Sequence, residues 1–300
     1  MRIGIDLGGS KIEILAIDSN GETLLRERRV TPKDDYNRIL ATVLDLVRET
    51  EERTGQSGTV GVAIPGAVSL ATGRIKNANT VCLIGKPLAE DLEGILARPV
   101  RLSNDANCFA LSEATDGAAA GTASVFGVIL GTGVGGGIVI DHRVQAGINA
   151  IAGEWGHNPL PWPESNELPG PECYCGRRGC IESFLSGPGL ARDYHLTTGH
   201  EAKPPEIVRL AEAGDEGGVF TLAHYYDRLA RALAHVINIL DPGVIVLGGG
   251  LSNIDALYEE IPARWGDYVF SDRVDTRLTK AIYGDSSGVR GAAWLWPEEK

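Results

Sequence analysis

One arrangement of residues occurs twice in this chain, and it limits the folds the chain can adopt. An apolar strand, Ile3–Leu7, runs into Gly8-Gly9-Ser10-Lys11 and is followed by alternating apolar residues. A second strand, Val125–Leu130, runs into the glycine-rich segment 131–137 and then Ile138–Ile140. Because each turn joins two strands, neither is a P-loop or a dinucleotide fingerprint, which both lead from a strand into a helix. The repetition predicts two related α/β lobes with a cleft between them.

The segments between and after these strands show helical patterns, and no obvious linker divides the chain. Apolar residues recur at helical spacing, and caps or glycines end the patterns. The expected helices span 37–53, 88–96, 104–114, 222–240 and 291–296. No low-complexity linker separates the two halves, so we expect residues 1–117 plus about 289–300 to form a smaller N-terminal lobe, and 118–288 a larger C-terminal lobe.

Charge and composition exclude several classes of function. The formal net charge of −12 over 300 residues argues against nonspecific binding to nucleic acid or to anionic membranes. No apolar run approaches the roughly 18 residues of a membrane span. The N-terminus reads directly as a strand rather than as a leader peptide. Five cysteines, three of them clustered, are typical of a reducing compartment, so we expect a cytoplasmic protein.

Four residues in the span 153–182 have the spacing of a metal site. His157 is followed by Cys173, Cys175 and Cys180, and one imidazole plus three thiolates satisfies tetrahedral zinc. The alternatives are buried free thiols, or a disulfide that would leave one of the three cysteines unpaired. The sequence predicts a structural zinc site, shaping a polar pocket rather than performing chemistry.

The glycine turns are candidates for binding phosphate through backbone amides. Asp6 can hold a Mg²⁺ that neutralises the phosphates, while Ser10 and Lys11 add a hydroxyl and a cation. The alternative is a set of ordinary tight turns. The residues expected to bind nucleotide are Gly4, Asp6, Gly8, Gly9, Ser10, Lys11, Gly131, Thr132, Gly133, Gly135, Gly248, Gly249 and Gly250.

Asp105 is the candidate general base. It follows the strand Val100–Leu102 and precedes a helix, where the positive end of the dipole keeps a carboxylate ionised. Phosphoryl transfer needs such a group near the attacking hydroxyl, whose proton leaves late in a loose transition state. The alternative is that Asn104-Asp105 only caps the helix.

Taken together, the motifs resemble the ROK family of sugar kinases along the whole chain. The resemblance rests on Asp-Leu-Gly-Gly-Ser-Lys at 6–11, Asn-Asp-Ala-Asn at 104–107, the glycine segment 131–137, Gly-Glu-Trp-Gly-His at 153–157 and the Cys-x-Cys-Gly-x-x-Gly-Cys-Ile-Glu pattern at 173–182. Within the family, the chain looks most like bacterial fructokinase of the manno(fructo)kinase type. One departure is Val81-Cys82-Leu83, where that type leads us to expect an aromatic residue.

The resemblance implies an actin/hexokinase-like (ribonuclease H-like) two-lobed fold, ATP and Mg²⁺ as cofactors beside zinc, and a homodimer. It implies ATP-dependent phosphorylation of a hexose at a primary hydroxyl, D-fructose to fructose 6-phosphate by preference, with mannose or glucose as further substrates. The implied sugar-binding residues are Gly66, Asn79, Asn104, Asp105, Glu154, His157 and Glu182. His157 would bind zinc through one ring nitrogen and donate to the sugar through the other.

Three alternatives stay open at this stage. The nearest is a glucokinase or an N-acetylglucosamine or N-acetylmannosamine kinase on the same fold. A ROK transcriptional regulator is disfavoured, because we expect the first strand at Ile3 to leave no room for a helix-turn-helix domain and because the chain is acidic. An actin-like structural ATPase is disfavoured by the cysteine cluster and the carboxylates beside it.

Overall fold

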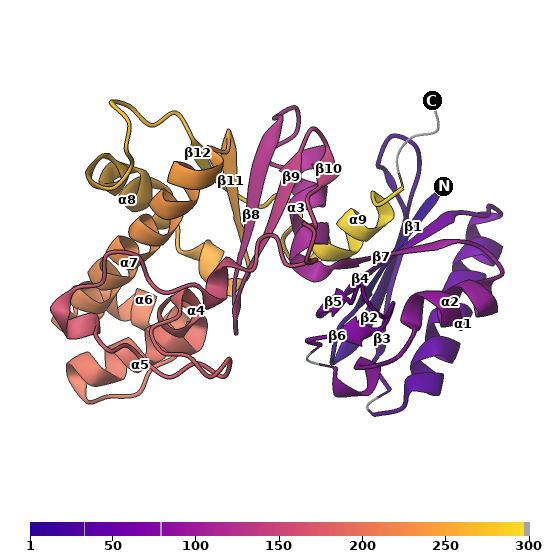
Figure 1. The fold of residues 1–300 in the computed structure, drawn as a ribbon, viewed down its shortest axis with the longest axis horizontal. Helices are drawn as coiled ribbons and strands as arrows, with labels where there is room; N and C mark the ends of the chain where they lie inside the picture. The colour runs from indigo at the N-terminus through magenta and orange to yellow at the C-terminus, as the bar shows by residue number, and fades with distance from the viewer. Residues whose placement is uncertain (33, 79, 297–300) are drawn as a thin grey trace. The chain divides into compact units, whose positions relative to one another are not determined.

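The computed structural model describes residues 1–32, 34–78 and 80–296, which divide into two compact units (Figure 1). Unit 1 comprises Met1–Gly121, Gly137–Ala152 and the described residues from Ile282 onward. Unit 2 comprises Thr122–Gly136 and Gly153–Ala281. The division assigns the segment 137–152 to unit 1, whereas the sequence analysis groups it with the second lobe.

Unit 1 is built on a five-stranded sheet in the order β3-β2-β1-β4-β7. Its strands are β1 (Arg2–Leu7), β2 (Lys11–Ile17), β3 (Thr23–Val30), β4 (Thr59–Ile64) and β7 (Val100–Asn104). The first three pair antiparallel, and β1, β4 and β7 pair parallel. The carboxyl ends of the parallel strands therefore meet at one edge of the sheet, which is where α/β sheets bind ligands.

Helices cover both faces of this sheet. The helices of the unit are α1 (Tyr36–Thr54), α2 (Leu88–Leu96), α3 (Asp105–Thr115) and α9 (Ser287–Ala293). The apolar residues of α1 and α2 form one core with alternate residues of β1, such as Ile3 and Ile5. Gly61 faces α9, where a Cβ would lie 1.9 Å from the carbonyl oxygen of Ala292, so glycine is required for this close packing.

Smaller elements of unit 1 complete the description. They are β5 (Ala67–Val68), β6 (Ile75–Lys76), β10 (Arg143–Val144), η1 (Val81–Leu83) and η6 (Gly284–Ser286). The expected terminal helix 291–296 begins earlier in the structure, at Ser287, and ends at Ala293. Within the described parts of the chain, no helix combines the length and apolar character needed to cross a bilayer.

The second sheet has the order β10-β9-β8-β11-β12. Its other strands are β8 (Ser124–Leu130), β9 (Val134–Ile140), β11 (Val244–Gly248) and β12 (Arg277–Lys280). β8, β11 and β12 are parallel. The expected glycine turn 131–137 is shorter than predicted, because β9 already begins at Val134. Gly136 lies inside the strand, where a Cβ would be 2.7 Å from the carbonyl oxygen of Gly153.

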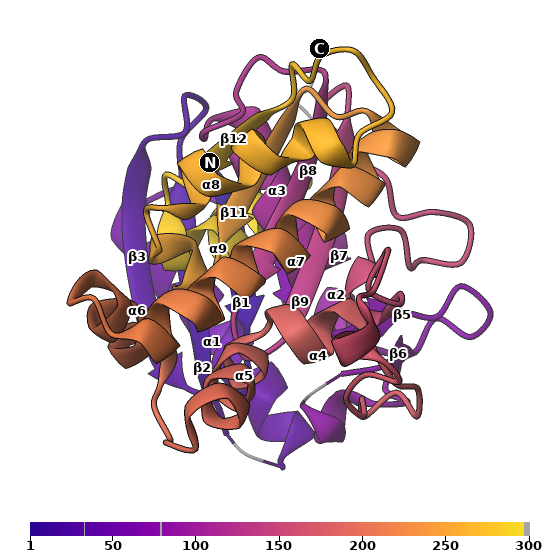
Figure 2. The same ribbon diagram turned by 90° about the vertical axis from the view of Figure 1, so that its left-hand side faces the viewer.

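Helices α5, α6 and α8 pack around the long helix α7 in unit 2 (Figure 2). The helices of the unit are α4 (Ile181–Leu185), α5 (Gly187–Thr198), α6 (Pro204–Glu212), α7 (Glu216–Leu240) and α8 (Leu257–Arg264). Short 3-10 turns are η2 (Trp155–His157), η3 (Ser165–Glu167), η4 (Gly250–Asn253) and η5 (Trp265–Asp267). Asp215 caps α7 by accepting a hydrogen bond from the Gly218 amide at 2.7 Å.

Candidate active site

The candidate base and two expected sugar-binding residues lie at the carboxyl edge of the unit 1 sheet. The Asn104 side chain, at the end of β7, donates to the carbonyl oxygen of Gly66 at 3.1 Å. Gly66 follows β4 and has a φ of +135°, a conformation that favours glycine. This hydrogen bond ties together the ends of two neighbouring parallel strands. The backbone at Gly66 is thereby fixed beside the start of α3.

Asp105 is the first residue of α3, and Asn104 is its N-cap. The Asn104 Oδ1 accepts from the Ala106 amide at 2.9 Å, and the Asp105 Oδ1 accepts from the same amide at 2.8 Å. Capping therefore explains part of this motif, as the alternative interpretation expects. The same carboxylate lies at the N-terminus of α3, at the positive end of the helix dipole. Its place at the carboxyl edge of the sheet is the one expected for the candidate base.

Asp6 is the second carboxylate at this edge, near the end of β1. Burial raises its pKa to about 6, with further upward contributions from the charges of Asp105 and Glu13. Lys11 and Arg28 act in the opposite direction. A carboxylate whose negative charge is incompletely compensated favours a bound cation. The oxygen donors therefore fit Mg²⁺, and Asp6 is the residue that would hold it.

The turn after β1 is braced by the end of β3. The Gly8 amide donates to the Lys11 carbonyl oxygen at 3.0 Å, and the Thr31 hydroxyl donates to the Gly8 carbonyl oxygen at 2.7 Å. The Thr31 amide also donates to the carbonyl oxygen of Ser10 at 3.1 Å. A Cβ at Gly8 would lie 2.9 Å from the Lys11 carbonyl oxygen, so the tight turn requires glycine. Packing accounts for Gly4, where a Cβ would meet the carbonyl oxygen of Val289 at 2.0 Å.

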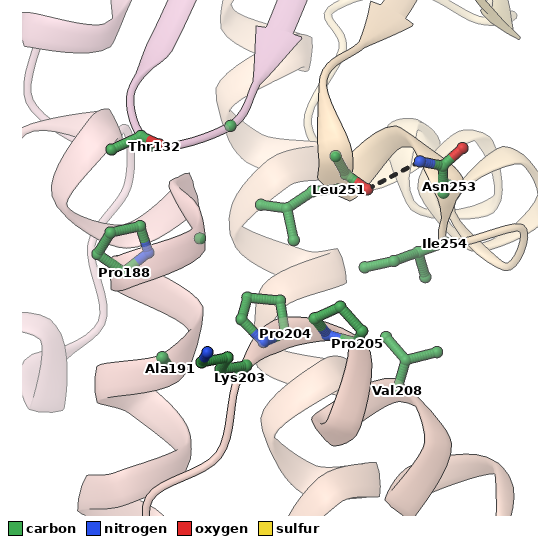
Figure 3. A pocket seen from close by; sticks show the side chains of 13 residues that line it. Thr132, Pro188, Ala191, Lys203, Pro204, Pro205, Val208, Leu251, Asn253 and Ile254 are labelled. Atoms are coloured by element: carbon green, nitrogen blue, oxygen red, sulfur yellow. Dashed lines mark hydrogen bonds between the residues drawn. The ribbon is translucent and has the colours of Figure 1, made fainter. Parts of the chain in front are cut away.

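Unit 2 contains a cavity of about 740 Å³ at the carboxyl ends of β8 and β11 (Figure 3). Residues from four segments line it: Gly131, Thr132, Gly187, Pro188, Ala191, Lys203, Pro204, Pro205, Val208, Gly250, Leu251, Asn253 and Ile254. Three of the expected nucleotide-binding residues, Gly131, Thr132 and Gly250, are among them. A mostly apolar cavity with a few polar groups is typical of a small-molecule site.

Two helices begin at this cavity. The Gly187 amide, at the start of α5, donates to the carbonyl oxygen of Gly131 at 2.8 Å. Pro204 and Pro205 open α6 and face the same hollow as Leu251 (Figure 3). The start of α5 offers no open amide to phosphate, because Gly187 donates to Gly131, Pro188 has no N–H and Gly189 donates to the Ser186 hydroxyl at 3.2 Å. The apolar side chains of the cavity suit a flat base. The sequence analysis missed the proline-containing helix starts, although proline at a first helical turn is a recognisable signal.

The remaining glycines of the nucleotide prediction have other surroundings. Gly248 is buried within β11, and Gly135 lies in β9, where its carbonyl oxygen accepts from the Trp155 indole at 3.0 Å. Gly249 has a φ of +82°, and a Cβ there would lie 2.4 Å from the Leu130 carbonyl oxygen. It sets the turn that brings Gly250 to the cavity. At Gly133, a Cβ would lie 2.6 Å from a Glu182 carboxylate oxygen.

The four expected zinc ligands come together in unit 2. The ligand atoms of His157, Cys173, Cys175 and Cys180 all lie within 4.8 Å of one another. The Cys173 Sγ is 3.5 Å from the His157 Nδ1, and the Sγ atoms of Cys175 and Cys180 are 3.6 Å apart. Tetrahedral zinc with ordinary bond lengths puts S···N pairs about 3.6 Å and S···S pairs about 3.8 Å apart. The donor set and its spacing fit zinc.

The expected sugar-binding residues of unit 2 lie around this cluster. The Glu182 carboxylate accepts from the Val134 amide at 2.9 Å, which fixes its direction. Glu154 is exposed. The second ring nitrogen of His157, expected to face the sugar, lies 2.9 Å from the hydroxyl of Tyr174, a residue that the sequence analysis missed. Partial desolvation beside the cluster, together with charges that include Glu182 and Glu154, raises the pKa of Tyr174, although most of its surface is exposed. Asn79, also expected to bind sugar, lies outside the described residues.

A buried ionic network supports the loop between His157 and Cys173, and no sequence motif indicates it. The Glu167 carboxylate accepts from Arg228 Nε at 2.7 Å and from Arg231 Nη2 at 2.8 Å. Arg231 also donates to the carbonyl oxygen of Trp162 at 2.8 Å. Burial opposes ionisation of Glu167, but hydrogen bonds from Arg231 and Arg228 outweigh it and lower the pKa to about 2. The network attaches the loop to α7.

The chain is similar to known proteins along nearly its whole length. The N-acetyl-D-glucosamine kinase of Yersinia enterocolitica is 40% identical over 98% of this chain and 99% of its own length. That of Vibrio cholerae is 42% identical over 98% and 99%. Among solved structures, the ROK hexokinase from Thermus thermophilus matches with a TM-score of 0.86 and 33% identity, covering 98% of this chain and 96% of that one.

A second solved structure is the ROK family glucokinase from Streptomyces griseus in complex with glucose and AMPPNP. It matches with a TM-score of 0.77 and 27% identity, and the match covers 98% of both chains. The expected two-lobed actin/hexokinase-like fold is thereby confirmed. The model of the ROK family matches residues 2–299. The chain belongs to the ROK family and has the fold of its sugar kinases.

Proposed function

We propose that this ROK-family sugar kinase transfers the terminal phosphoryl group of ATP to the primary hydroxyl of N-acetyl-D-glucosamine. The observation that carries the proposal is its full-length similarity, at 40% identity or more, to N-acetyl-D-glucosamine kinases from several bacteria. This sugar stands among the alternatives of the sequence analysis, where fructose is the main expectation. The relatives reported above do not support fructose. The departure at Val81-Cys82-Leu83 from the fructokinase pattern agrees with them.

Each part of the proposed reaction has a residue suited to it. The sugar hydroxyl attacks the γ-phosphorus, the bond from that phosphorus to the β,γ-bridging oxygen breaks, and ADP leaves with the bond's electrons. The hydroxyl proton passes to the Asp105 carboxylate, which lies at the N-terminus of α3. The cavity of unit 2 takes the adenosine part of ATP. The Gly8 and Gly131 amides already donate to the carbonyl oxygens of Lys11 and Gly133, so other groups of these turns are left to bind phosphate. When bound, Mg²⁺ would neutralise phosphate charge beside Asp6.

The sugar hydroxyls form hydrogen bonds with Asn104, Glu154, His157 and Glu182, of which the two carboxylates act as acceptors, and Asn79 and the Gly66 backbone complete the expected set. Carboxylates accept strong hydrogen bonds from sugar hydroxyls. Zinc would fix the tautomer and direction of His157 by binding its Nδ1, leaving Nε2 for the sugar once Tyr174 turns away. Tyr174 is 83% exposed, so this rotation meets little resistance.

A coupled assay that detects ADP tests the proposed substrate. N-acetyl-D-glucosamine, fructose, mannose and glucose are compared at matched concentrations with purified protein, ATP and Mg²⁺. We expect the highest kcat/KM for N-acetyl-D-glucosamine. A higher value for fructose would restore the fructokinase interpretation, and turnover of none of the four sugars would refute the proposed function.

Asp105→Asn tests the proposed base. The amide keeps the shape and the hydrogen bond to the Ala106 amide but cannot take a proton, so we expect kcat to fall by about 10²- to 10⁴-fold with little change in sugar affinity. Asp45→Asn, on the exposed side of α1, is the matched control and should keep normal kcat. Near-normal turnover of Asp105→Asn would show that another group accepts the proton.

A further inference from the structure

Glu13 is a buried carboxylate that gathers three cations in unit 1. Its side chain is fully buried, and it accepts hydrogen bonds from Arg26 Nε at 2.6 Å and Arg28 Nε at 2.7 Å. The Lys11 Nζ lies 3.7 Å away. A buried carboxylate needs a compensating charge, but one cation supplies it. Around Glu13 alone, therefore, three positive charges meet one negative charge.

The strand register places this cluster beside the expected phosphate site. Asp6, Glu13 and Arg28 are direct partners across β1, β2 and β3, so their side chains lie in a row on one face of the sheet. The electrostatic influence of Lys11 and Arg28 on Asp6 agrees with this placement. The row leads from Arg28 through Glu13 to Asp6, the carboxylate that would hold Mg²⁺. Asp6 lies close to the turn that begins at Gly8.

The two arginines keep most of their hydrogen-bond donors for another partner. A guanidinium carries five N–H donors, and each arginine uses its Nε on Glu13. Their side chains are 40% and 42% exposed. Within residues 1–32, 34–78 and 80–296, no acceptor meets their terminal Nη groups. A planar fork fixed at Nε by a buried acid is preorganised to bind the oxygens of a phosphoryl group.

We propose that Lys11, Arg26 and Arg28 form a phosphoryl-binding subsite on unit 1, with Glu13 as the positioning residue. The inference rests on the proposed function, because the phosphoryl group arrives on ATP or leaves on the sugar phosphate. The negative groups facing the cluster are Glu13 and Asp6, with Asp105 beyond them. Mg²⁺ would offset Asp6, leaving the cation surplus for the phosphate oxygens.

Arg28→Met tests the subsite, with Arg29→Met as the matched control. Arg29 is the next residue of β3, faces the opposite side of the sheet and pairs with Glu49. Both changes remove one positive charge from the same strand. We expect Arg28→Met to raise the Kd of MgATP by about tenfold, from the loss of a charge-assisted hydrogen bond, and Arg29→Met to change it less than twofold.

The measurements distinguish the two sources of the phosphoryl group. If Arg28→Met binds MgATP and ADP more weakly by calorimetry, the subsite takes a phosphoryl group of the nucleotide. If Arg28→Met is inhibited more weakly by the sugar 6-phosphate, the subsite takes the phosphoryl group of the product. Either result supports the subsite. If Arg28→Met and Arg29→Met match in all three measurements, the subsite does not exist, even where the wild type phosphorylates N-acetyl-D-glucosamine. Absence of sugar turnover in the wild type would instead refute the proposed function.

A double-mutant cycle tests Glu13 as the positioning residue. Glu13→Gln should raise the Kd of MgATP in the wild type but add little in the Arg28→Met background, because both changes act through one guanidinium. Full additivity would refute the positioning role. Arg28→Lys keeps the charge but loses the fork, so it should recover part of the affinity. If Glu13→Gln fails to fold, the half-exposed Arg28 variants still decide the subsite.

Discussion

Replacing Glu167 by glutamine removes the negative charge between two buried arginines, and its cost can be worked from the structure. The Glu167 side chain is 3% exposed, and its pKa falls from 4.5 to about 2 on folding. The difference between these two pKa values corresponds to about 3 kcal/mol of stability at neutral pH. Because the folded-state pKa is the lower one, this contribution is present above pH 4.5 and is lost as the pH falls towards 2.

Urea denaturation followed by tryptophan fluorescence measures the effect. At pH 7 we expect Glu167→Gln to lower the free energy of unfolding by about 3 kcal/mol, since the arginines lose their buried partner. The difference in the free energy of unfolding between wild type and variant should be smaller than at pH 7 by about 0.8 kcal/mol at pH 4 and by about 2 kcal/mol at pH 3. At these pH values the wild-type carboxyl group becomes protonated in the unfolded chain.

Glu164→Gln is the matched control for this prediction. Glu164 is an exposed acid of the same loop, and a glutamine there can still accept the hydrogen bond that its side chain takes in the η3 capping box. We expect less than about 0.5 kcal/mol from this change. Equal destabilisation by the two substitutions, or a gap at Glu167 that is the same at pH 7 and pH 4, would refute the reasoning.

Two further predictions concern the metal cluster and the cavity. Cys175→Ser removes a thiolate, so bound zinc should fall and the sugar KM should rise as His157 loses its fixed direction; unchanged zinc by metal analysis would contradict the ligand set, and Cys82→Ser is the control. Val208→Asp places a charge in the cavity and should weaken ATP binding about tenfold with an unchanged sugar KM. Val219→Asp, at an exposed site on α7, should leave both ATP affinity and sugar KM unchanged. An equal loss of ATP affinity in the two variants would show that the cavity does not bind the adenine base.

Local patterns succeeded where the residues that define an element are neighbours in the chain. The hairpin of β1 and β2 follows from two apolar strands around Gly8-Gly9, and helix α2 has the bounds 88–96 that its periodicity predicts. The segment 131–137 shows the limit of such patterns. Gly136 belongs to a glycine-rich run that is typical of a loop, yet it lies in β9, because residues 134–140 pair with neighbouring strands of the second sheet. The backbone of Gly153 approaches so closely that a Cβ at Gly136 would not fit.

The sequence by itself determined the fold class, the turn chemistry and the spacing of His157 with the three cysteines, because these depend on residue type and short-range order. Only the tertiary structure decided which distant residues meet. It brought Val208 and Ile254 to one cavity, and the strand register set Glu13 between Asp6 and Arg28. Those encounters depend on long-range packing and strand pairing, to which each residue contributes a small part of the energy, so no local pattern records them.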